Sequence, residues 1–253
     1  MLTFAANLSW MFKEHDFLDR FAAAADAGFG TVEYLFPYDH DPDQIAARLA
    51  RHKLKLALFN APPGDLAKGE RGLACMPERA AEFRASIANA LDYACVTGAP
   101  RLHLMAGLGT GDRALAAYKD ALTFACQEAA AHDVDILIEP LNPRDAPGYL
   151  LNDFGLAQRL IGELQHPNLK LQFDIYHRQI IHGDVMRGLE ELLPITGHIQ
   201  ISSVPDRNEP TTGELNDLRI LKALEKMGYA GVIGCEYTPA GGTLEGLSWM
   251  KGL

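Results

Sequence analysis

The sequence has few cysteines and no long apolar run, and we expect no secretion signal. Its four cysteines, Cys75, Cys95, Cys126 and Cys235, are far apart and form no C-x-x-C pair. This spacing argues against a zinc cluster or a redox motif and is typical of reduced thiols. No window approaches the roughly 18 apolar residues that a membrane span needs. The N-terminus, MLTFAANLSWMFKEHD, lacks a basic region followed by an apolar stretch and a cleavage site. We therefore expect a cytoplasmic protein with no membrane partner.

Positive charge is also scarce. The chain has 23 Lys and Arg against 33 Asp and Glu, which gives a formal net charge of −10. Because phosphate binding depends on clustered Lys and Arg, we expect no nucleic-acid partner. No G-x-G-x-x-G motif follows the first apolar run, so we also expect no nucleotide cofactor. The composition favours chemistry on a small molecule.

Short β-type runs alternate with amphipathic helical patterns along the whole chain, which predicts a parallel sheet of the α/β class. The predicted strands lie near 2–8, 31–36, 54–59, 101–106, 135–141, 169–175, 197–203 and 230–237. The predicted helices lie at 14–27, 42–52, 78–97, 113–131, 153–165, 180–193, 216–227 and 243–252. This alternation predicts a (β/α)8 TIM barrel, and since such a barrel of about 250 residues is one domain, we expect a single domain over 1–253. The alternative is an open doubly wound sheet.

Two predicted connections are unusually long for a barrel. They cover 60–77, after the third predicted strand, and 203–215, after the seventh. Barrel active sites lie at the carboxyl ends of the strands, where these connections begin. We expect both loops to contribute to function, with a plain surface insertion as the alternative.

Four polar residues stand at or near the ends of separate apolar runs, namely DILIEP, LKLQFD, GHIQIS and GVIGCE. They are Glu139, Asp174, Gln200 and Glu236. Because barrel strands end at one mouth, we expect these side chains to share a cavity. Three carboxylates there would repel one another without a cation, and oxygen ligands suit Mg²⁺ or Mn²⁺ better than Zn²⁺. The pattern predicts a divalent metal site, although any one carboxylate could instead be a helix cap or an ion-pair partner.

Several segments, in order along the chain, resemble the hydroxypyruvate isomerase family of xylose isomerase-like barrels. They are FAANLSWMF, VEYLFPY, ALFNAPPGD, GERGL, LIEPLN, FDIYH, GHIQI, PDRNEPTTGELN and IGCEY. ANLS, LFPY, ALFN and HLMAG resemble in particular the branch that acts on 2-oxo-tetronates. One residue departs from the family pattern, because Asp217 stands where an aromatic residue usually follows GELN.

The resemblance implies roles for the four polar residues. Glu139 and Glu236 would be the catalytic acid and base, and all four residues, with Asp174 and Gln200, would bind the metal. Barrel relatives that epimerise ketoses usually have histidine in place of Gln200, which favours the hydroxypyruvate-type branch. The implied reaction moves a carbonyl by one carbon through an enediolate, by proton transfer between two carboxylates.

Two further residues are candidates for substrate binding at the mouth. Arg207 in PDRNEP is the candidate partner of a substrate carboxylate, since a guanidinium binds a planar anion at two points. Its alternative is a surface ion pair with Asp206 or Glu209. His177, three residues beyond Asp174, would hydrogen-bond a substrate oxygen or orient Asp174, or else simply open the next helix.

Five weaker substrate-binding candidates complete the predicted site. Asn7, Asn60 and His103 lie in or at the end of predicted strands and are expected at the pocket floor, with core hydrogen bonding as the alternative. Glu70 and Arg71 lie in the long loop after the third strand, where they would close over the substrate or pair with each other in solvent.

The sequence thus predicts an isomerase that acts on a small oxo-hydroxy acid, with hydroxypyruvate and tartronate semialdehyde, or 2-oxo-tetronate and 3-oxo-tetronate, as the substrate pair. The first alternative is a metal-dependent ketose 3-epimerase with the same barrel. The others are a DNA-repair endonuclease of this barrel type, which the net charge disfavours, and a sugar-binding protein without catalysis. The sequence allows a homo-oligomer but does not require one.

Overall fold

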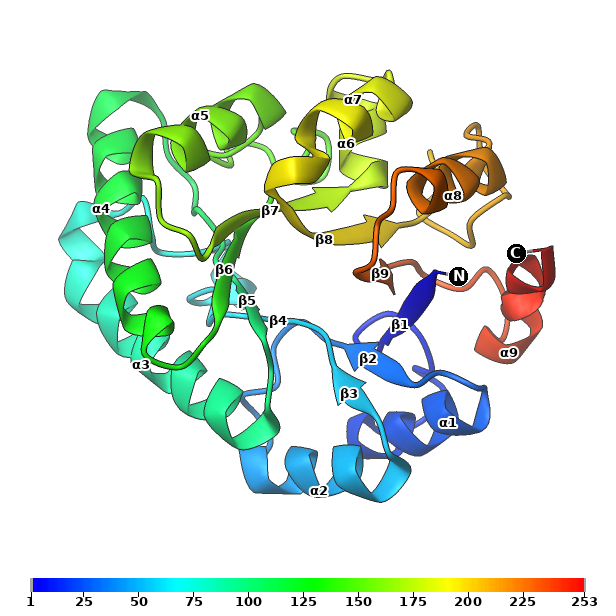
Figure 1. The fold of residues 1–253 in the computed structure, drawn as a ribbon. Coiled ribbons are helices and arrows are strands. Elements are labelled where there is room, and N and C mark those ends of the chain that lie inside the picture. The colour runs from blue at the N-terminus through cyan, green and yellow to red at the C-terminus, as the bar shows by residue number, and fades with distance from the viewer. Residues whose placement is uncertain (1, 253) are drawn as a thin grey trace.

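Parallel strands form a closed ring around a central axis, and the helices cover its outside (Figure 1). The computed structural model describes residues 2–252. The strands are β1 (Thr3–Asn7), β2 (Thr31–Glu33), β3 (Lys55–Leu56), β4 (Phe59–Asn60), β5 (Arg101–His103), β6 (Asp135–Ile138), β7 (Leu169–Asp174), β8 (Thr196–Ile201) and β9 (Val232–Cys235). The predicted (β/α)8 TIM barrel is therefore confirmed.

The third predicted strand, 54–59, differs from the prediction because it is divided. The sheet order is β3-β2-β1-β9-β8-β7-β6-β5-β4, so the two ends of the sheet come from one stretch of chain. β3 pairs with β2, and β4 pairs with β5. The stretch changes its hydrogen-bonding neighbour midway, and the backbone bond from Tyr34 N to Leu58 O (3.3 Å) closes the ring there. Together β3 and β4 fill one strand position.

The helices lie close to their predicted positions with one exception. They are α1 (Arg20–Asp26), α2 (Pro42–His52), α3 (Ala80–Thr97), α4 (Gly111–Ala130), α5 (Phe154–Leu164), α6 (Ile175–Ile181), α7 (Val185–Leu192), α8 (Asp217–Lys226) and α9 (Thr243–Gly246). The predicted helix 180–193 is wrong, because α6 begins at the end of β7 and a break separates it from α7. Gly183 and Asp184, with φ of 62° and 45°, are left-handed there and end the helix.

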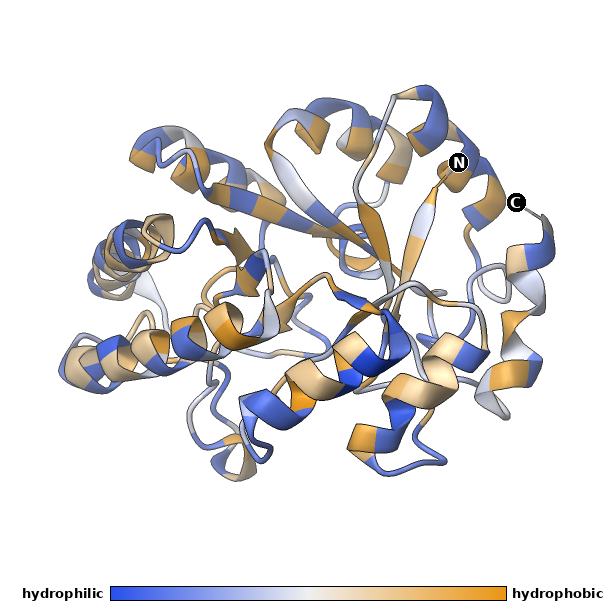
Figure 2. Ribbon diagram, turned by 60° about the horizontal axis from the view of Figure 1, so that its bottom comes forward, coloured by the Kyte–Doolittle hydropathy of each residue, from blue (hydrophilic) through white to orange (hydrophobic). Residues whose placement is uncertain are grey.

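Apolar and polar residues are mixed along the outer helices (Figure 2). In α2, Asp41 caps the helix by accepting a hydrogen bond from Asp43 N (2.9 Å), and Pro42 fits the first turn, where no N–H partner is needed. Ile45 and Leu49, one turn apart, are buried against the barrel. Among the described residues, no helix is both long enough and apolar enough to span a membrane.

A bulge between β7 and β8 sets which side chains face the barrel interior. Leu171 pairs with Thr196, but Gln172 pairs with His198, so Gly197 is an extra residue on β8. A Cβ at Gly197 would collide with the side chains of Lys170 and Leu137. The bulge brings Asp174 beside Gln200 and so places these predicted ligands at one level.

Candidate active site

A cavity of about 350 Å³ opens at the carboxyl ends of the strands. Both long loops reach it, since 61–76 contributes Leu66 and Arg71, and the loop after β8 contributes Arg207. The predicted residues that line the cavity are Asn60, Arg71, His103, Glu139, His177, Arg207 and Glu236. Both predicted loops therefore line the cavity, and their contribution to function stays a prediction.

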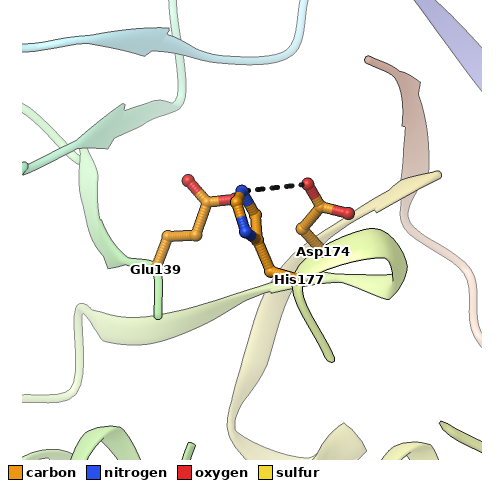
Figure 3. A group of neighbouring side chains, drawn as sticks. All are labelled: Glu139, Asp174 and His177. Carbon is orange, nitrogen blue, oxygen red and sulfur yellow. Dashed lines mark ion pairs between the residues drawn. The ribbon is translucent and has the colours of Figure 1, made fainter. Parts of the chain in front are cut away.

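Glu139 and His177, which line this cavity, lie close to Asp174, which does not line it (Figure 3). Glu139 directly follows β6, Asp174 ends β7, and His177 lies in the first turn of α6. One ligand atom from each lies within 4.8 Å of the others, and all three residues are buried. This group could hold a metal ion.

Burial sets the protonation of the carboxylates. It raises the pKa of Glu139 well above its ordinary value, and the neighbouring Glu236 and Asp174 raise it further. It also raises the pKa of Glu236 to about 8, while Arg207 acts in the opposite direction. The pKa of Asp174 is raised for the same reason. Near neutral pH the site can therefore hold a proton on a glutamate, which is what an acid and base pair needs.

Arg207 lies between two of these carboxylates. Its Nη2 atom is 3.5 Å from Asp174 Oδ2 and 3.3 Å from Glu236 Oε2. The guanidinium carbon is 4.9 Å from the ring centre of Trp10 and 4.9 Å from that of Tyr176. Burial would lower the pKa of Arg207, but the carboxylates outweigh burial and raise it. Arg207 is a fixed cation in the site, so the predicted alternative of a surface pair with Asp206 or Glu209 is wrong.

The backbone holds Arg207 in a strained position. Its φ is 55°, in the left-handed region that branched and long side chains rarely adopt. Three hydrogen bonds fix this turn: Arg207 N donates to Ser203 O (3.0 Å), Ser203 N donates to Asn208 O (3.0 Å), and Thr238 N donates to Arg207 O (2.9 Å). Strain kept in place by its surroundings is typical of functional positions.

Asp217, the departure from the family pattern, has a structural role at the base of this loop. It is fully buried in the first turn of α8, and its Oδ2 atom accepts a hydrogen bond from Thr211 N (2.7 Å). Thr211 itself has a φ of 77°. Asp217 thus ties down the far end of the loop that carries Arg207.

The hydrogen bonds of His177 identify its tautomer. Its Nδ1 atom accepts from Asn142 N (3.0 Å), so a neutral ring carries its proton on Nε2. That Nε2 atom lies 3.7 Å from Asp174 Oδ2. Burial and then Arg207 lower the pKa of His177 well below its ordinary value. His177 is therefore a neutral imidazole whose N–H faces Asp174 and the cavity.

His103 and Asn60 also line the cavity. Burial lowers the pKa of His103 to about 3, so its Nε2 atom, 3.7 Å from Glu139 Oε2, forms no ion pair at neutral pH. Neither ring nitrogen of His103 has a hydrogen-bond partner among the described residues. The backbone oxygen of Asn60 accepts from Tyr38 (2.7 Å), and Asn60 lines the cavity. Both residues can offer hydrogen bonds to a ligand.

Asn7 and Gln200 lie beneath the cavity and do not line it. Asn7 donates to Glu33 Oε1 (3.0 Å), and Gln200 Nε2 donates to the same oxygen (2.8 Å). Gln200 Oε1 accepts from Gln172 (2.7 Å). Asn7 was predicted either to line the pocket floor or to form hydrogen bonds in the core, and the structure shows the second.

Glu70 and Arg71 point in different directions and do not pair with each other. Glu70 accepts from Asp65 N (2.6 Å) and from Arg79 (2.5 Å), so it clamps the loop instead of facing the cavity. Gly72, with a φ of 106°, packs against the backbone of Met105, where any Cβ would collide. Arg71, between these two anchors, lines the cavity and forms no ion pair with a carboxylate of the described residues.

Sequence reasoning missed several residues of the site. Trp10 donates from Nε1 to Glu236 Oε1 (3.1 Å), and Tyr176 donates to Asp145 Oδ2 (2.8 Å) at the cavity edge. Trp10 and Tyr176 both stand in the segments that carry the family resemblance, and that signal could have identified them. Asp145 lies outside those segments, so nothing in the sequence identified it.

The fold and the site together define a xylose isomerase-like TIM barrel. The family model of that description matches residues 21–253. A crystal structure described as an AP endonuclease of family 2 from Brucella melitensis superposes with a TM-score of 0.97 and 45% identity, over 100% of this chain and 99% of that chain.

Curated relatives narrow the family further. A 2-oxo-tetronate isomerase from Cupriavidus necator is 52% identical over 255 residues, which cover 99% of this chain and 98% of the relative. A hydroxypyruvate isomerase from Escherichia coli is 41% identical over 254 residues, again 99% of this chain and 98% of the relative. The chain belongs to the hydroxypyruvate isomerase family, and it is an isomerase. The resemblance read from the sequence is confirmed.

Proposed function

We propose that this isomerase interconverts a 2-oxo-3-hydroxy acid and its carbonyl isomer through an enediolate. The substrate pair is hydroxypyruvate and tartronate semialdehyde, or 2-oxo-tetronate and 3-oxo-tetronate. The observation that carries the proposal is a cavity lined by two buried glutamates of raised pKa, Glu139 and Glu236. The relatives that share 52% and 41% of its sequence bear the names of these activities.

The donor set fits a divalent cation. Glu139 Oε1 is buried and accepts no hydrogen bond from the described residues, and Asp174 adds a second buried carboxylate nearby. We propose Glu139, Asp174, Gln200 and Glu236 as ligands, and Mg²⁺ or Mn²⁺ as the ion, because all four offer oxygen. Gln200 would bind through the second lone pair of Oε1, since that atom already accepts from Gln172 (2.7 Å). When bound, such a cation stabilises negative charge that develops on the substrate oxygens.

His177 is proposed as a hydrogen-bond donor and not as a ligand. A ligating histidine usually donates its second ring N–H to an acceptor, whereas His177 Nδ1 accepts from Asn142 N. Its Nε2 atom therefore carries the proton in this structure, and it would have to lose that proton before it could bind a metal. A neutral N–H can donate to Asp174 or to a substrate oxygen without giving up its proton.

The proposed reaction moves one carbon-bound proton. One glutamate removes the proton from the carbon that bears the hydroxyl group, and a carboxyl group returns a proton to the former carbonyl carbon. A hydroxyl proton passes from one oxygen to the other, so atoms and electrons balance without an oxidant or a cofactor such as a nicotinamide. Of the two glutamates, Glu236 is held in place by Trp10 and Arg207.

We propose Arg207 as the partner of the substrate carboxylate, with Arg71 on the facing loop. Arg207 Nε is buried and has no acceptor among the described residues. The rings of Trp10 and Tyr176 pack against the same guanidinium group. A buried donor without an acceptor costs free energy unless a ligand supplies one. Asn60 and His103 complete the proposed substrate contacts, and Glu70 and Asn7 support them from behind.

Turnover in D₂O tests the proton-transfer route. If a glutamate exchanges the abstracted proton with solvent before returning one, NMR of the product should show deuterium on the carbon that accepts the proton. A hydride shift between the carbons would place none there. Because a shielded carboxylate can return the same proton, the matched experiment uses substrate deuterated at the donor carbon. Intramolecular transfer that persists when both Glu139 and Glu236 are replaced by glutamine would contradict the proposal.

Replacing Arg207 with lysine tests carboxylate recognition. The change keeps the positive charge between Asp174 and Glu236 but loses the two-point geometry. We expect KM for three- and four-carbon oxo acids to rise roughly tenfold, with a smaller change in kcat. An uncharged ketose serves as the control, and turnover of it should scarcely change. Equal losses on both substrates would mean that Arg207 only supports its loop.

The ketose 3-epimerase remains the second candidate, since it uses the same barrel and inverts a carbinol instead of moving a carbonyl. The feature against it is Gln200 in place of the usual histidine. Product analysis on a four-carbon oxo acid and on a hexulose separates the two.

For compartment and organisation, we propose a cytoplasmic single-domain enzyme, on the basis of its free cysteines.

A further inference from the structure

Glu209 is a buried carboxylate that the proposed reaction does not use. It lies two residues after Arg207 in the loop that follows β8, and 5% of its surface is exposed. Both of its carboxylate oxygens accept from Ala240 N, at 3.1 and 3.2 Å. Burying a carboxylate costs free energy unless hydrogen bonds replace its contacts with water. The bond from Ala240 compensates this cost, and it joins the loop of Arg207 to a segment 31 residues further along the chain.

Two further hydrogen bonds join the same two segments. Thr238 N donates to Arg207 O (2.9 Å), and Asn208 Nδ2 donates to Thr238 O (2.8 Å). Thr238 lies two residues beyond Glu236, which directly follows β9. The loop of Arg207 is therefore fastened at three successive residues to the chain that leaves Glu236.

Gly246 in α9 leaves room for the Glu209 side chain. A Cβ at Gly246 would collide with Glu209 Oε1 and would lie 3.0 Å from two carbons of the same side chain. The φ of Gly246 is not in the left-handed region, so its backbone conformation does not call for glycine. The space that Glu209 occupies does, and the chain from Ala240 to Gly246 is thus shaped around this carboxylate.

The fastening of the loop matters because the backbone of Arg207 is strained. A φ of 55° is unfavourable for a long side chain, and such a conformation persists only where its surroundings maintain it. From this backbone, Arg207 Nη2 reaches to 3.3 Å from Glu236 Oε2, and the guanidinium packs on the ring of Trp10. If the loop separated from the chain at Thr238, the backbone would relax and the guanidinium would leave this place.

We propose that Glu209 is a positioning residue for substrate binding. By accepting from Ala240 N, it holds the loop of Arg207 against the chain that follows Glu236. It thereby keeps the Arg207 guanidinium where that group binds the substrate carboxylate. The inference rests on the proposed function for the role of Arg207. Glu209 does not line the cavity, so it acts on the substrate through Arg207.

Replacing Glu209 with methionine tests the hydrogen bond, because methionine keeps the length of the side chain but offers no oxygen to Ala240 N. We expect KM for oxo acids to rise roughly tenfold, with a smaller change in kcat, as for Arg207→Lys. Glu209→Gln keeps an amide oxygen for Ala240 N, so its KM should stay within about threefold of wild type. Steady-state kinetics on three- and four-carbon oxo acids measure both variants.

A double-mutant cycle with Arg207→Lys separates positioning from a general structural role. If Glu209 acts through Arg207, adding Glu209→Met to Arg207→Lys should raise KM by no more than about twofold, since the geometry that Glu209 maintains is already lost. A residue that only stabilises the fold would add its full effect in either background. Additive effects would therefore overturn the proposal.

Glu14→Met is the matched control for the hydrogen bond. Glu14 also accepts from a backbone N–H of the C-terminal segment, that of Thr243 (2.7 Å), but it comes from the chain before α1. Its replacement should leave kcat and KM for oxo acids within about twofold of wild type. A rise in KM equal to that of Glu209→Met would count against the proposal, because any loosening of the C-terminal segment would then be enough.

Hydrogen exchange of backbone amides, followed by NMR, gives a readout that needs neither metal nor substrate. The N–H groups of Thr238 and Ala240 should be protected in wild type and in Glu209→Gln. Both should exchange faster in Glu209→Met, because the two segments then separate. If Thr238 kept its full protection while Ala240 lost it, the segments would be joined without Glu209, and the proposal would fail.

These measurements also separate the inference from the proposed function. If wild type shows no isomerase activity on oxo acids, the proposed function fails, and amide exchange still decides whether Glu209 holds the two segments together. If wild type is active and the effects in the cycle are additive, the inference alone fails. If Glu209→Met does not fold, Glu209→Asp takes its place in every measurement, because its carboxylate is one methylene too short to reach Ala240 N.

Discussion

Replacing Glu139 or Glu236 with glutamine is expected to lower kcat by at least about a hundredfold, the low end for loss of a general acid or base. Glutamine keeps the size of the side chain and its oxygen but cannot exchange a proton. The raised pKa values of both residues are the reason for the size of the effect, since these groups can change protonation near neutral pH. Steady-state kinetics on hydroxypyruvate and 2-oxo-tetronate measure it.

Because both glutamates are also proposed ligands, the metal content of each variant has to be measured alongside activity. Asp145→Asn is a matched control, since it removes another carboxylate from the cavity wall that we give no part in proton transfer. It should cost less than about tenfold, the scale of one hydrogen bond. A near-wild-type rate in either glutamate variant would rule out the two-glutamate mechanism.

The metal-free protein is expected to lose stability as the pH rises from about 5 to about 9, the range set by the shifted carboxyls. Burial raises the pKa values of Glu139, Asp174 and Glu236, in the last case to about 8. Such a group has a higher pKa in the folded state than in the unfolded state. Its contribution to stability is fully present below the unfolded-state pKa and is lost as the pH rises through the folded-state pKa. For Glu236 the shift from 4.5 to about 8 corresponds to a loss on the order of 5 kcal/mol, or roughly 10–20 °C in Tm.

Adding Mg²⁺ or Mn²⁺ should reverse this loss, because a cation binds the ionised carboxylates and the native state only. The gain in Tm should therefore grow with pH. Thermal unfolding between pH 5 and pH 9, with EDTA or with metal, measures both effects. Asp174→Asn should reduce the gain, and a gain that is unchanged in this variant would remove Asp174 from the proposed ligands.

The barrel was predictable because its periodicity is local. Each apolar run and each amphipathic helix carries its own pattern, and the alternation leaves few topologies. The division of 54–59 into β3 and β4 was not predictable, since it depends on which neighbours the strand meets. The break before α7 could have been predicted, because Gly183 is a helix-ending residue. The sequence did not indicate that α6 begins directly after Asp174.

The candidate site was predictable to the extent that it lies at strand ends. Glu139, Asp174 and Glu236 lie where parallel strands converge, so sequence position alone brings them together. Glu33 also ends a strand, but its fully buried surroundings depend on Gly234, far away in the chain, where any Cβ would collide with the Glu33 carboxyl group. The rings of Trp10 and Tyr176 that pack against Arg207 also come from distant segments of the chain. No local sequence pattern predicts these contacts.

The bulge at Gly197 also bears on how the barrel closes. Side chains alternate along a strand, so a slip of β8 by one residue would place isoleucine where Gln200 now meets Glu33. The Glu33 carboxylate would then be buried against hydrocarbon, with its donors unmatched, at a cost that apolar packing cannot offset. The hydrogen bonds of Glu33 therefore select the register of β8. A register shifted by one residue would leave the Glu33 carboxylate without its partner Gln200, whereas the observed register pairs the two and also forms the cavity.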